Sequence, residues 1–394
     1  MHKREQKMIT AKLLDAMERN GLDAMIFSKL DSIYYATGYI SAFSKMGMNS
    51  TLAVLTAEGK LTVIVNQFEK QAAAEFLPED VSIETYPTWI YIEDFDDPNE
   101  VKSEHPDPDK PVKMAAEIIH GYRALAKVGV QEKSFSHISW DLLCDCFGKE
   151  NLKDCERMLE LVRAYKTPWE VDMLRTAAML CERTMTETAR ATLPGMTEAE
   201  LMNLYRRIGY SLSVNVNEVG QAHTLGECYS PTVIGRNKVI EPGDVIRLDV
   251  GPEYFGYVSD LARTYAVGKA SARKEAIYAA LYKGHCKAME MIGPGVKMSE
   301  VFQKVQETIR KNGLPTYVRG HFGHSVGTGE CEQFPYISPT SEFVFEPGMV
   351  FCVETPYYGS VSNSFNLEDT IVITEDGYER FTTLPDNLYW AQGK

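Results

Sequence analysis

The stretch GDVIRLDVGPEYFGYVSDLARTY, residues 243–265, decides the fold of this chain. Its apolar run VIRLDV ends in Asp249, and Asp260 follows eleven residues later at the start of a second such run. Comparable settings occur further along the chain: His324 in FGHSVG, Glu354 in VFCVET and Glu368 in FNLEDTIVI. Carboxylates within apolar runs would be half-buried, and a buried charge needs a charged partner or a metal.

Each of these five residues also has an ordinary structural interpretation. A single Asp after a strand is usually a turn or cap residue, and a single His is usually a hydrogen-bonded polar residue. The nearest basic partners are Arg247 and Arg263, so the runs contain few groups that would neutralise the carboxylates. Four carboxylates and one imidazole form an oxygen-rich set that could bridge two divalent cations. Two such cations activate a water and polarise a substrate oxygen, which predicts a metalloenzyme.

Composition limits the classes of protein that the chain can represent. Its 394 residues exceed a usual single core, which predicts two domains. The net charge of −14 and the pI near 5.2 argue against nucleic-acid and anionic-membrane partners. No apolar stretch is long enough to span a bilayer, and the charged N-terminus lacks the apolar core of a signal peptide. The eight scattered cysteines suggest reduced thiols, so we expect a cytoplasmic protein.

Residues 1–158 are predicted to form an alternating α/β domain. Residues 9–31 predict a helix followed by a strand, and 31–39, DSIYYATGY, predict another strand. The segments TLAVLT and LTVIVN around AEGK predict a hairpin, and VSIETYP predicts a strand. The acidic, proline-rich residues 92–112 predict a surface loop. A helix near 113–126, the strand KVGVQ and the helix SHISWDLLCDCFG complete this domain.

Residues 159–394 are predicted to form a second domain with a different element order. Thr167, Pro168 and Glu170 form a helix-start signature, so a long helix is expected to about Ala191. Thr197 caps a second helix, and residues 212–270 are rich in strand patterns. A further helix pair over 270–292 and 298–313 precedes mostly strands from 317 onward. The fold class is therefore α/β (α+β).

These motifs resemble the creatinase/aminopeptidase P/prolidase group of the pita-bread superfamily, which is peptidase M24-like and includes the methionine aminopeptidases. The resemblance covers almost the whole chain. It is carried by DSIYYATGY, LVRAYKTPWEVDMLRTAA, GDVIRLDVGPEYFGYVSDLARTY, GHFGHSVG, PGMVFCVETPYY and NLEDTIVITEDGYE, in that order. It implies a creatinase-like N-terminal domain of mixed α/β structure and a C-terminal pita-bread domain with a curved antiparallel sheet.

The resemblance also implies roles for the five residues. Asp249 would chelate one metal, Asp260 and Glu368 would bridge two, and His324 would bind the second. Glu354 would be a ligand and would accept the proton of the nucleophilic water. Oxygen ligands with one imidazole favour two manganese ions, with zinc, cobalt or iron as alternatives. His321 is the best further acid/base candidate, although a hydrogen bond from His321 to a ligand is an equally good interpretation.

The chain departs from the peptidase pattern at positions that usually contact substrate. Cys331, followed by Glu332, replaces the histidine seven residues after His324. Asn366 replaces an arginine two residues before Glu368, and Gly320 replaces a histidine. The stretch before the first ligand carries Tyr229 with Cys228, Ser230 and Thr232, but lacks the usual substrate-facing histidine, for which His223 is a distant substitute. The substrate-binding candidates are therefore Tyr229, Cys331, Glu332 and Asn366.

The resulting functional expectation is a metal-dependent hydrolase that resembles Xaa-Pro aminopeptidase or prolidase and acts on a small peptide-like or C–N substrate. The alternatives are a lyase like the dimethylsulfoniopropionate lyases, a creatinase-like C–N hydrolase, and a binding module without catalysis. Because several carbonyl-binding groups are replaced, ordinary Xaa-Pro dipeptides are expected to be poor substrates. The resemblance and the long segment 89–112, with Trp89, Tyr91 and Phe95, predict a homodimer in which this segment covers the partner's site.

Overall fold

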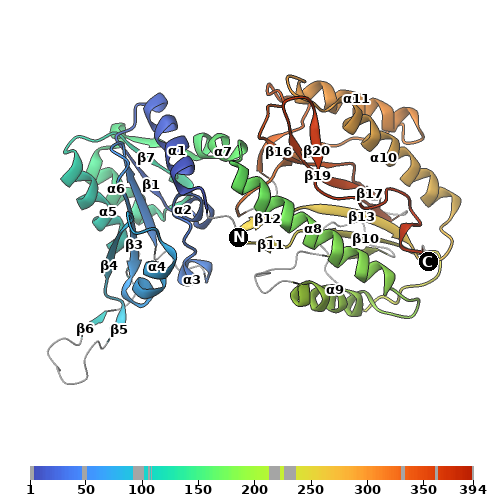
Figure 1. The fold of residues 1–394 in the computed structure, drawn as a ribbon, viewed down its shortest axis with the longest axis horizontal. Helices are drawn as coiled ribbons and strands as arrows, with labels where there is room; N and C mark the ends of the chain where they lie inside the picture. The colour runs from blue at the N-terminus through green and yellow to red at the C-terminus, as the bar shows by residue number, and fades with distance from the viewer. Residues whose placement is uncertain are drawn as a thin grey trace. The chain divides into compact units, whose positions relative to one another are not determined.

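The structure is a computed structural model that describes residues 4–46, 51–91, 102–104, 107, 109–212, 222–225, 237–329, 333–359 and 363–392. The chain divides into two compact units, residues 1–162 and 163–394, which are drawn in Figure 1. Helix α7 (Glu156–Ala164) crosses the junction between them. Each unit contains its own sheet and its own hydrophobic cores.

The N-terminal unit is built on a mixed six-stranded sheet in the order β4-β3-β2-β1-β7-β8. Its strands are β1 (Ala24–Phe27), β2 (Leu52–Thr56), β3 (Leu61–Asn66), β4 (Ser82–Tyr86), β7 (Val128–Val130) and β8 (Leu152–Asp154). The β1–β2 and β2–β3 pairs are antiparallel, whereas β3–β4, β1–β7 and β7–β8 are parallel. The hairpin predicted around AEGK is therefore confirmed as β2–β3.

Helices cover both faces of this sheet and bury two separate cores. The helices of the unit before α7 are α1 (Gln6–Asn20), α2 (Leu30–Thr37), α3 (Ala42–Lys45), α4 (Lys70–Phe76), α5 (Asp109–Tyr122) and α6 (His137–Phe147). Residues of α1, α2, α4 and α7 contribute to one core, and residues of α5 and α6 contribute to the other. The short 3-10 turns are η1 (Gln67–Glu69), η2 (Glu132–Ser134) and η3 (Lys149–Asn151).

Two N-terminal predictions were wrong. DSIYYATGY forms helix α2 rather than a strand, because burial of Ile33, Tyr35 and Ala36 against the core outweighs the strand preference of its aromatic and β-branched residues. The segment predicted as a loop over 92–112 also contains regular structure. Strand β6 (Lys102–Glu104) pairs with β5 (Trp89–Tyr91), and α5 begins at Asp109 rather than near 113. Residues 92–100, including Phe95, lie outside the described part of the chain.

The C-terminal unit is built on an eight-stranded sheet with the main order β15-β14-β16-β19-β13-β10-β9, to which β20 adds beside β19. All of its strand pairs are antiparallel. The strands are β9 (Ala222–Leu225), β10 (Val245–Val250), β13 (Leu261–Ala266), β14 (Gly323–Ser325), β15 (Gln333–Tyr336), β16 (Val350–Glu354), β19 (Glu368–Ile373) and β20 (Tyr378–Arg380). The unit also contains two separate two-stranded sheets: β11 (Glu253–Tyr254) with β12 (Tyr257–Val258), and β17 (Tyr357–Gly359) with β18 (Asn363–Phe365).

Two helix pairs pack on one face of this sheet and leave the other face for the polar residues described below (Figure 1). They are α8 (Pro168–Arg190) with α9 (Glu198–Leu212), and α10 (Ala272–Met291) with α11 (Met298–Lys311). The predicted capping box is present, with Thr167 and Glu170 bonding each other's backbone N–H and Pro168 in the first turn. Thr197 caps α9, because its Oγ1 accepts a hydrogen bond from the Glu200 N–H. A final turn, η4 (Trp390–Gln392), packs its Trp390 ring against Tyr265.

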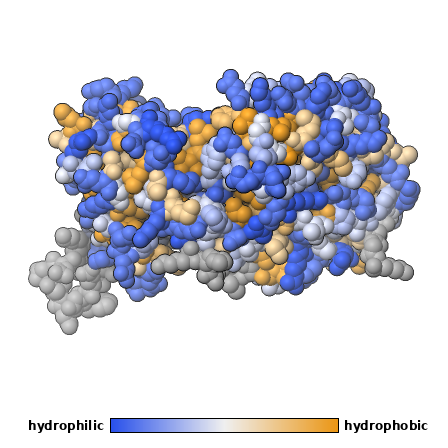
Figure 2. Space-filling model, turned by 45° about the horizontal axis from the view of Figure 1, so that its top comes forward, coloured by the Kyte–Doolittle hydropathy of each residue, from blue (hydrophilic) through white to orange (hydrophobic). Residues whose placement is uncertain are grey.

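The predicted combination of a mixed α/β unit with an antiparallel unit is confirmed. Within the described ranges, no helix has both the length and the apolar composition needed to cross a membrane. Figure 2 shows hydrophilic residues over much of the visible surface of each unit, with apolar residues in groups between them. The six cysteines in the described residues form no disulfide: Cys144, Cys146, Cys155, Cys181, Cys286 and Cys352.

Candidate metal centre

A row of side chains crosses four neighbouring strands on the open face of the C-terminal sheet. Glu354 on β16 is the Cα partner of Glu368 on β19, and Glu368 is the partner of Ala262 on β13. Ala262 is in turn the partner of Asp249 on β10. Cross-strand partners point to the same face of a sheet, so the row carries three carboxylates and one methyl group. The small Ala262 leaves space between Glu368 and Asp249.

A second row lies two residues away on the same face. His324 on β14 is opposite Cys352 on β16, and Cys352 is opposite Thr370 on β19. Asp260, two residues before Ala262, continues this row immediately before β13 begins. Gly323 allows β14 to approach β16 closely, because a Cβ at this position would overlap the carbonyl oxygen of Cys352. The glycine of the FGHS motif therefore helps to bring His324 to the site.

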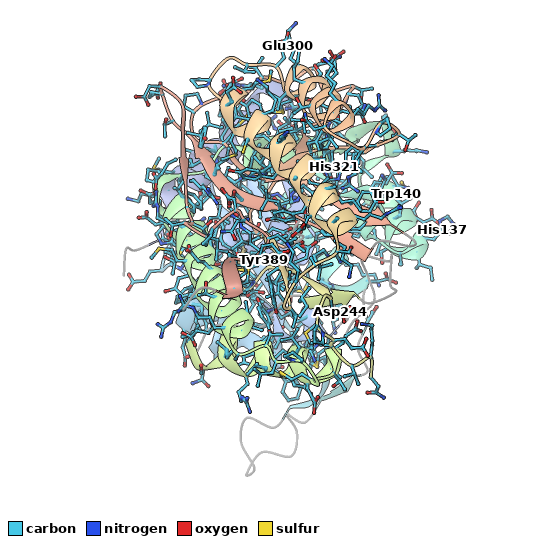
Figure 3. The ribbon with its side chains drawn as sticks, turned by 90° about the vertical axis from the view of Figure 1, so that its right-hand side faces the viewer. His137, Trp140, Asp244, Glu300, His321 and Tyr389 are labelled. Carbon is cyan, nitrogen blue, oxygen red and sulfur yellow. The ribbon has the colours of Figure 1, made fainter. Side chains whose placement is uncertain are left out.

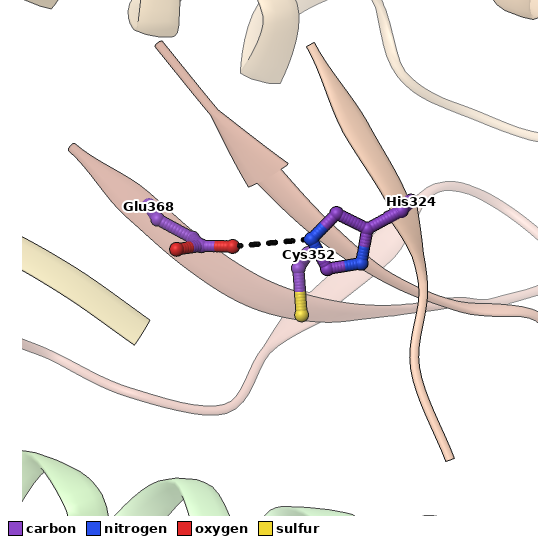
Figure 4. A group of neighbouring side chains, drawn as sticks. All are labelled: His324, Cys352 and Glu368. Atoms are coloured by element: carbon purple, nitrogen blue, oxygen red, sulfur yellow. Dashed lines mark ion pairs between the residues drawn. The ribbon is translucent and has the colours of Figure 1, made fainter. Parts of the chain in front are cut away.

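The donor atoms of these two rows fall into two compact groups. Ligand atoms of Asp249, Asp260 and Glu368 all lie within 4.8 Å of one another, and so do those of His324, Cys352 and Glu368. Glu368 belongs to both groups, which is the position of a residue that bridges two cations. Figure 4 shows the second group, with the three side chains on adjacent strands and the His324–Glu368 ion pair marked.

The hydrogen bonding of His324 suits a metal ligand. Its Nδ1 is 3.1 Å from the carbonyl oxygen of Ser325, and a carbonyl only accepts, so Nδ1 carries the proton. Nε2, the other ring nitrogen, faces Glu368 Oε1 at 3.6 Å and Asp260 Oδ2 at 3.8 Å. The Nε2 lone pair of a neutral imidazole could share a cation with the two carboxylates that it faces. The contact of Nδ1 with the Ser325 carbonyl holds the His324 ring in this orientation. The residues present therefore fit a divalent metal.

The electrostatics of Asp260 lead to the same conclusion. Burial, followed by the charges of Glu368 and Asp249, raises the pKa of the Asp260 carboxyl well above its ordinary value. Like charges brought this close to one another disfavour ionisation, and a cation among them would reverse the effect. The chemistry of this donor set is thus that of a cation-binding site.

Glu354 is held by groups outside the two donor clusters. Its Oε1 is 3.2 Å from Arg319 Nη2 and 3.3 Å from His321 Nδ1. Asn366 Nδ2 lies 3.3 Å from both Glu354 Oε2 and Asp249 Oδ2, so one amide links two carboxylates. The predicted acid/base candidate His321 therefore contacts Glu354, and the predicted substrate residue Asn366 contacts the carboxylates. Figure 3 shows His321 among the side chains of the unit, whereas Glu300 lies at its outline.

Two arginines flank Tyr358 beside these carboxylates. The guanidinium carbon of Arg247 is 5.2 Å from the centre of the Tyr358 ring, and that of Arg319 is 5.3 Å from it. Arg247 is fully buried and its Nη1 is 3.7 Å from Asp249 Oδ2. Each arginine therefore contacts one carboxylate of the site and the same aromatic ring. Burial raises the pKa of the Tyr358 phenol, with further contributions from Asp249 and Glu354.

The opposite face of β19 carries a buried ionic network. Asp369 Oδ1 is 2.5 Å from Arg263 Nη2, and Asp369 Oδ2 is 2.8 Å from His285 Nε2 on α10. Arg263 Nη1 also donates to the Glu368 carbonyl oxygen at 2.6 Å. Burial alone would raise the pKa of Asp369, but Arg263, together with His285 and Arg380, holds it well below its ordinary value. This network joins β13 to β19 at the ends that carry Asp260 and Glu368.

Several predicted residues cannot be placed from this structure. The substrate candidates Tyr229, Cys331 and Glu332, with Cys228, Ser230 and Thr232, lie outside the described residues. The backbone of His223 on β9 lies opposite Arg247 on β10. Among the described residues, no atom would lie within 4 Å of a Cβ at Gly320.

Sequence reasoning missed Cys352, Arg319 and Asp369. The alternation in VFCVE places Cys352 on the same strand face as Glu354, which was the available signal for the thiol. Arg319 and Asp369 have no comparable signal, because their partners, Glu354 and Arg263, are distant in the sequence.

Comparisons with known proteins agree with this fold. The family model of metallopeptidase family M24 matches residues 172–375, and that of the creatinase/prolidase N-terminal domain matches residues 10–165. An uncharacterized peptidase of Bacillus subtilis is 27% identical over 281 residues, 70% of this chain and 78% of that protein. An Xaa-Pro dipeptidase of Pyrococcus horikoshii is 23% identical over 378 residues, 94% and 95% of the two chains.

Solved structures show the same fold. The X-Pro aminopeptidase from Thermotoga maritima superposes with a TM-score of 0.80 at 19% identity, covering 96% of this chain and 99% of that one. The prolidase from Pyrococcus horikoshii superposes with a TM-score of 0.79 at 22% identity, covering 97% and 99%. The fold and the site thus define a hydrolase of the metallopeptidase class. The chain belongs to metallopeptidase family M24 and carries a creatinase/prolidase N-terminal domain.

Proposed function

We propose that this enzyme hydrolyses a small peptide-like substrate with metal assistance, and that the bond before a proline or a proline-like residue is its target. The observation that carries the proposal is the convergence of the donor atoms of Asp249, Asp260, His324 and Glu368 on one sheet face. The Xaa-Pro dipeptidases among the relatives support the choice of bond.

The proposed metal ligands are Asp249, Asp260, His324, Glu354 and Glu368. Glu368 would bridge, because it is shared by the two donor groups. Divalent cations, when bound, supply an acidified water and Lewis-acid polarisation of the substrate carbonyl. The proposal also includes manganese as the metal, with zinc, cobalt or iron as alternatives. It includes the homodimer and the cytoplasmic location that are expected from the sequence.

Glu354 and His321 would handle the proton. Glu354, whose Oε2 is linked through Asn366 to Asp249, would accept the proton of the attacking water. His321 Nδ1 is 3.3 Å from Glu354 Oε1, so the imidazole would take part in returning the proton to the leaving amine. Arg319 contacts the same oxygen and would hold the Glu354 carboxylate in place.

Arg319 would position the substrate, and the fully buried Arg247 would contribute positive charge only. The metal site would contain four ionised carboxylates, two divalent cations and two arginines. Its net charge would then be positive, which favours an anionic substrate group. Both guanidinium groups lie against the Tyr358 ring, which helps to hold them in place. A short peptide with a free terminal carboxylate has the required charge.

The test is turnover of Ala-Pro and Gly-Pro with manganese, cobalt or zinc, with both products identified. We expect slow hydrolysis, because Asn366 and Gly320 stand where peptidases of this group place carbonyl-binding side chains, and one lost oxyanion donor costs about two to three orders of magnitude. A kcat/KM above roughly 10⁴ M⁻¹s⁻¹ would show that the replacements are harmless. An elimination product, or no reaction with any peptide, would contradict the proposal.

A further inference from the structure

The Cys352 thiol lies within the proposed metal centre and has no role in the proposed function. Cys352 occupies the middle of β16, and its Cα partners are His324 on one side and Thr370 on the other. Its side chain is fully buried. Its Sγ lies within 4.8 Å of ligand atoms of both His324 and Glu368 (Figure 4).

The two donor groups differ in chemical character. Asp249, Asp260 and Glu368 offer only oxygen, the ligand preferred by manganese and magnesium. His324, Cys352 and Glu368 offer nitrogen, sulfur and oxygen. Soft thiolate ligands favour zinc, and zinc accepts mixed sets of nitrogen, sulfur and oxygen. The sequence-based preference for manganese at both positions did not take this thiol into account.

The contacts of Cys352 fix the place of its thiol. Sγ is 3.6 Å from the carbonyl oxygen of Asp260 and 3.7 Å from Thr370 Oγ1, and the Thr370 hydroxyl itself donates to the same carbonyl at 2.7 Å. His324 Nε2 faces the same space, because its Nδ1 is bonded to the Ser325 carbonyl. The sulfur atom and the His324 nitrogen therefore lie beside the same Glu368 carboxylate.

We propose that Cys352 is a metal ligand and makes the His324 position of the centre selective for zinc-class cations over manganese. The inference rests on the proposed metal centre and deepens it. Binding replaces the S–H bond by a sulfur–metal bond and releases the thiol proton to solvent, with no transfer of electrons. The Asp249–Asp260 position keeps its all-oxygen character.

X-ray absorption spectroscopy at the zinc edge tests this on the full-length, zinc-loaded protein. We expect a sulfur scatterer at about 2.3 Å, beside nitrogen and oxygen scatterers at about 2.0–2.1 Å. The signal should disappear in Cys352→Ser and persist in Cys286→Ser, which removes an exposed cysteine of α10. Competition between zinc and manganese should show the preference for zinc reduced by at least about tenfold in Cys352→Ser.

The outcomes separate this inference from the proposed function. Bound zinc without a sulfur scatterer in the wild-type protein would overturn the role of Cys352 and leave the metal centre intact. A sulfur scatterer that persists in Cys352→Ser would also overturn it. Failure of the wild-type protein to bind zinc, manganese or cobalt would overturn the metal centre itself. Because the wild-type spectrum decides the question, poor folding of the variant would not leave it open.

Discussion

Arg319 is the residue whose replacement should change substrate preference most clearly. It contacts Glu354 and stacks on Tyr358, and its side chain is 19% exposed, so a substrate can reach it. Arg319→Gln should raise KM for Xaa-Pro dipeptides by about ten- to hundredfold, the value of a hydrogen bond to a charged group. The effect on the matching Xaa-Pro amides should be small, because they lack the carboxylate.

The control for Arg319→Gln is Arg175→Gln. Arg175 also stacks on an aromatic ring, Phe381, and pairs with a glutamate, Glu379, but it lies on α8 away from the donor groups. Metal content is measured for both variants, since Arg319 contacts a proposed ligand. Equal losses on dipeptides and amides would argue that Arg319 acts on Glu354 and not on the substrate.

At the scale of elements, the Asp369 network should set the acid stability of the C-terminal unit. Asp369 has a lowered pKa in the folded state, so it stabilises the fold above the unfolded-state pKa of about 3.9 and loses this effect as the pH falls. Asp369→Asn removes the anionic partner of Arg263 and should cost about 3–5 kcal/mol at neutral pH.

Thermal unfolding followed from about pH 7 to about pH 3 measures this contribution. The difference in stability between wild type and Asp369→Asn should shrink progressively below about pH 4, because Asp369 is then protonated in the unfolded state while the folded state still holds it ionised. Asp15→Asn, which breaks an exposed pair with Arg19 on α1, should have little effect. A difference that stays constant with pH would show that charge is not the source of the stabilisation.

Local signals predicted most elements. The capping box at Thr167 and Glu170, the hairpin β2–β3 and the helix pair α10–α11 follow from short-range patterns, and each is present. The prediction of a strand at α2 was wrong because its aromatic residues favour a strand, whereas burial against the core favours the helix. Local sequence could not supply that information.

The site could be predicted in part, because some of its residues lie in recognisable local motifs. Five motifs in order identified the carboxylates and the histidine, and the structure brings Asp249, Asp260, His324 and Glu368 into compact donor groups. The place of Cys352 between His324 and Thr370 depends on strand register. The contact of Arg319 with Glu354 depends on tertiary packing. Neither register nor packing is visible in a single sequence.

At the scale of the whole molecule, we expect a homodimer. Strands β5 and β6 form a separate two-stranded sheet, and an isolated hairpin is marginally stable in water. A partner surface would stabilise it, in keeping with the expectation for segment 89–112. Sedimentation at micromolar concentration should give twice the 44.3 kDa mass of the chain, and a monomer under these conditions would argue against the proposal.

The most direct test of the central claim is the metal content of the purified protein, measured by mass spectrometry for wild type and His324→Ala. The wild-type protein should hold about two divalent ions per chain, as expected for a two-metal site. His324→Ala should lose one ion and nearly all activity. The remaining proposed ligands of that position are the Cys352 thiol and carboxylates, and the carboxylates repel one another. Undiminished metal content and full activity in His324→Ala would contradict the account.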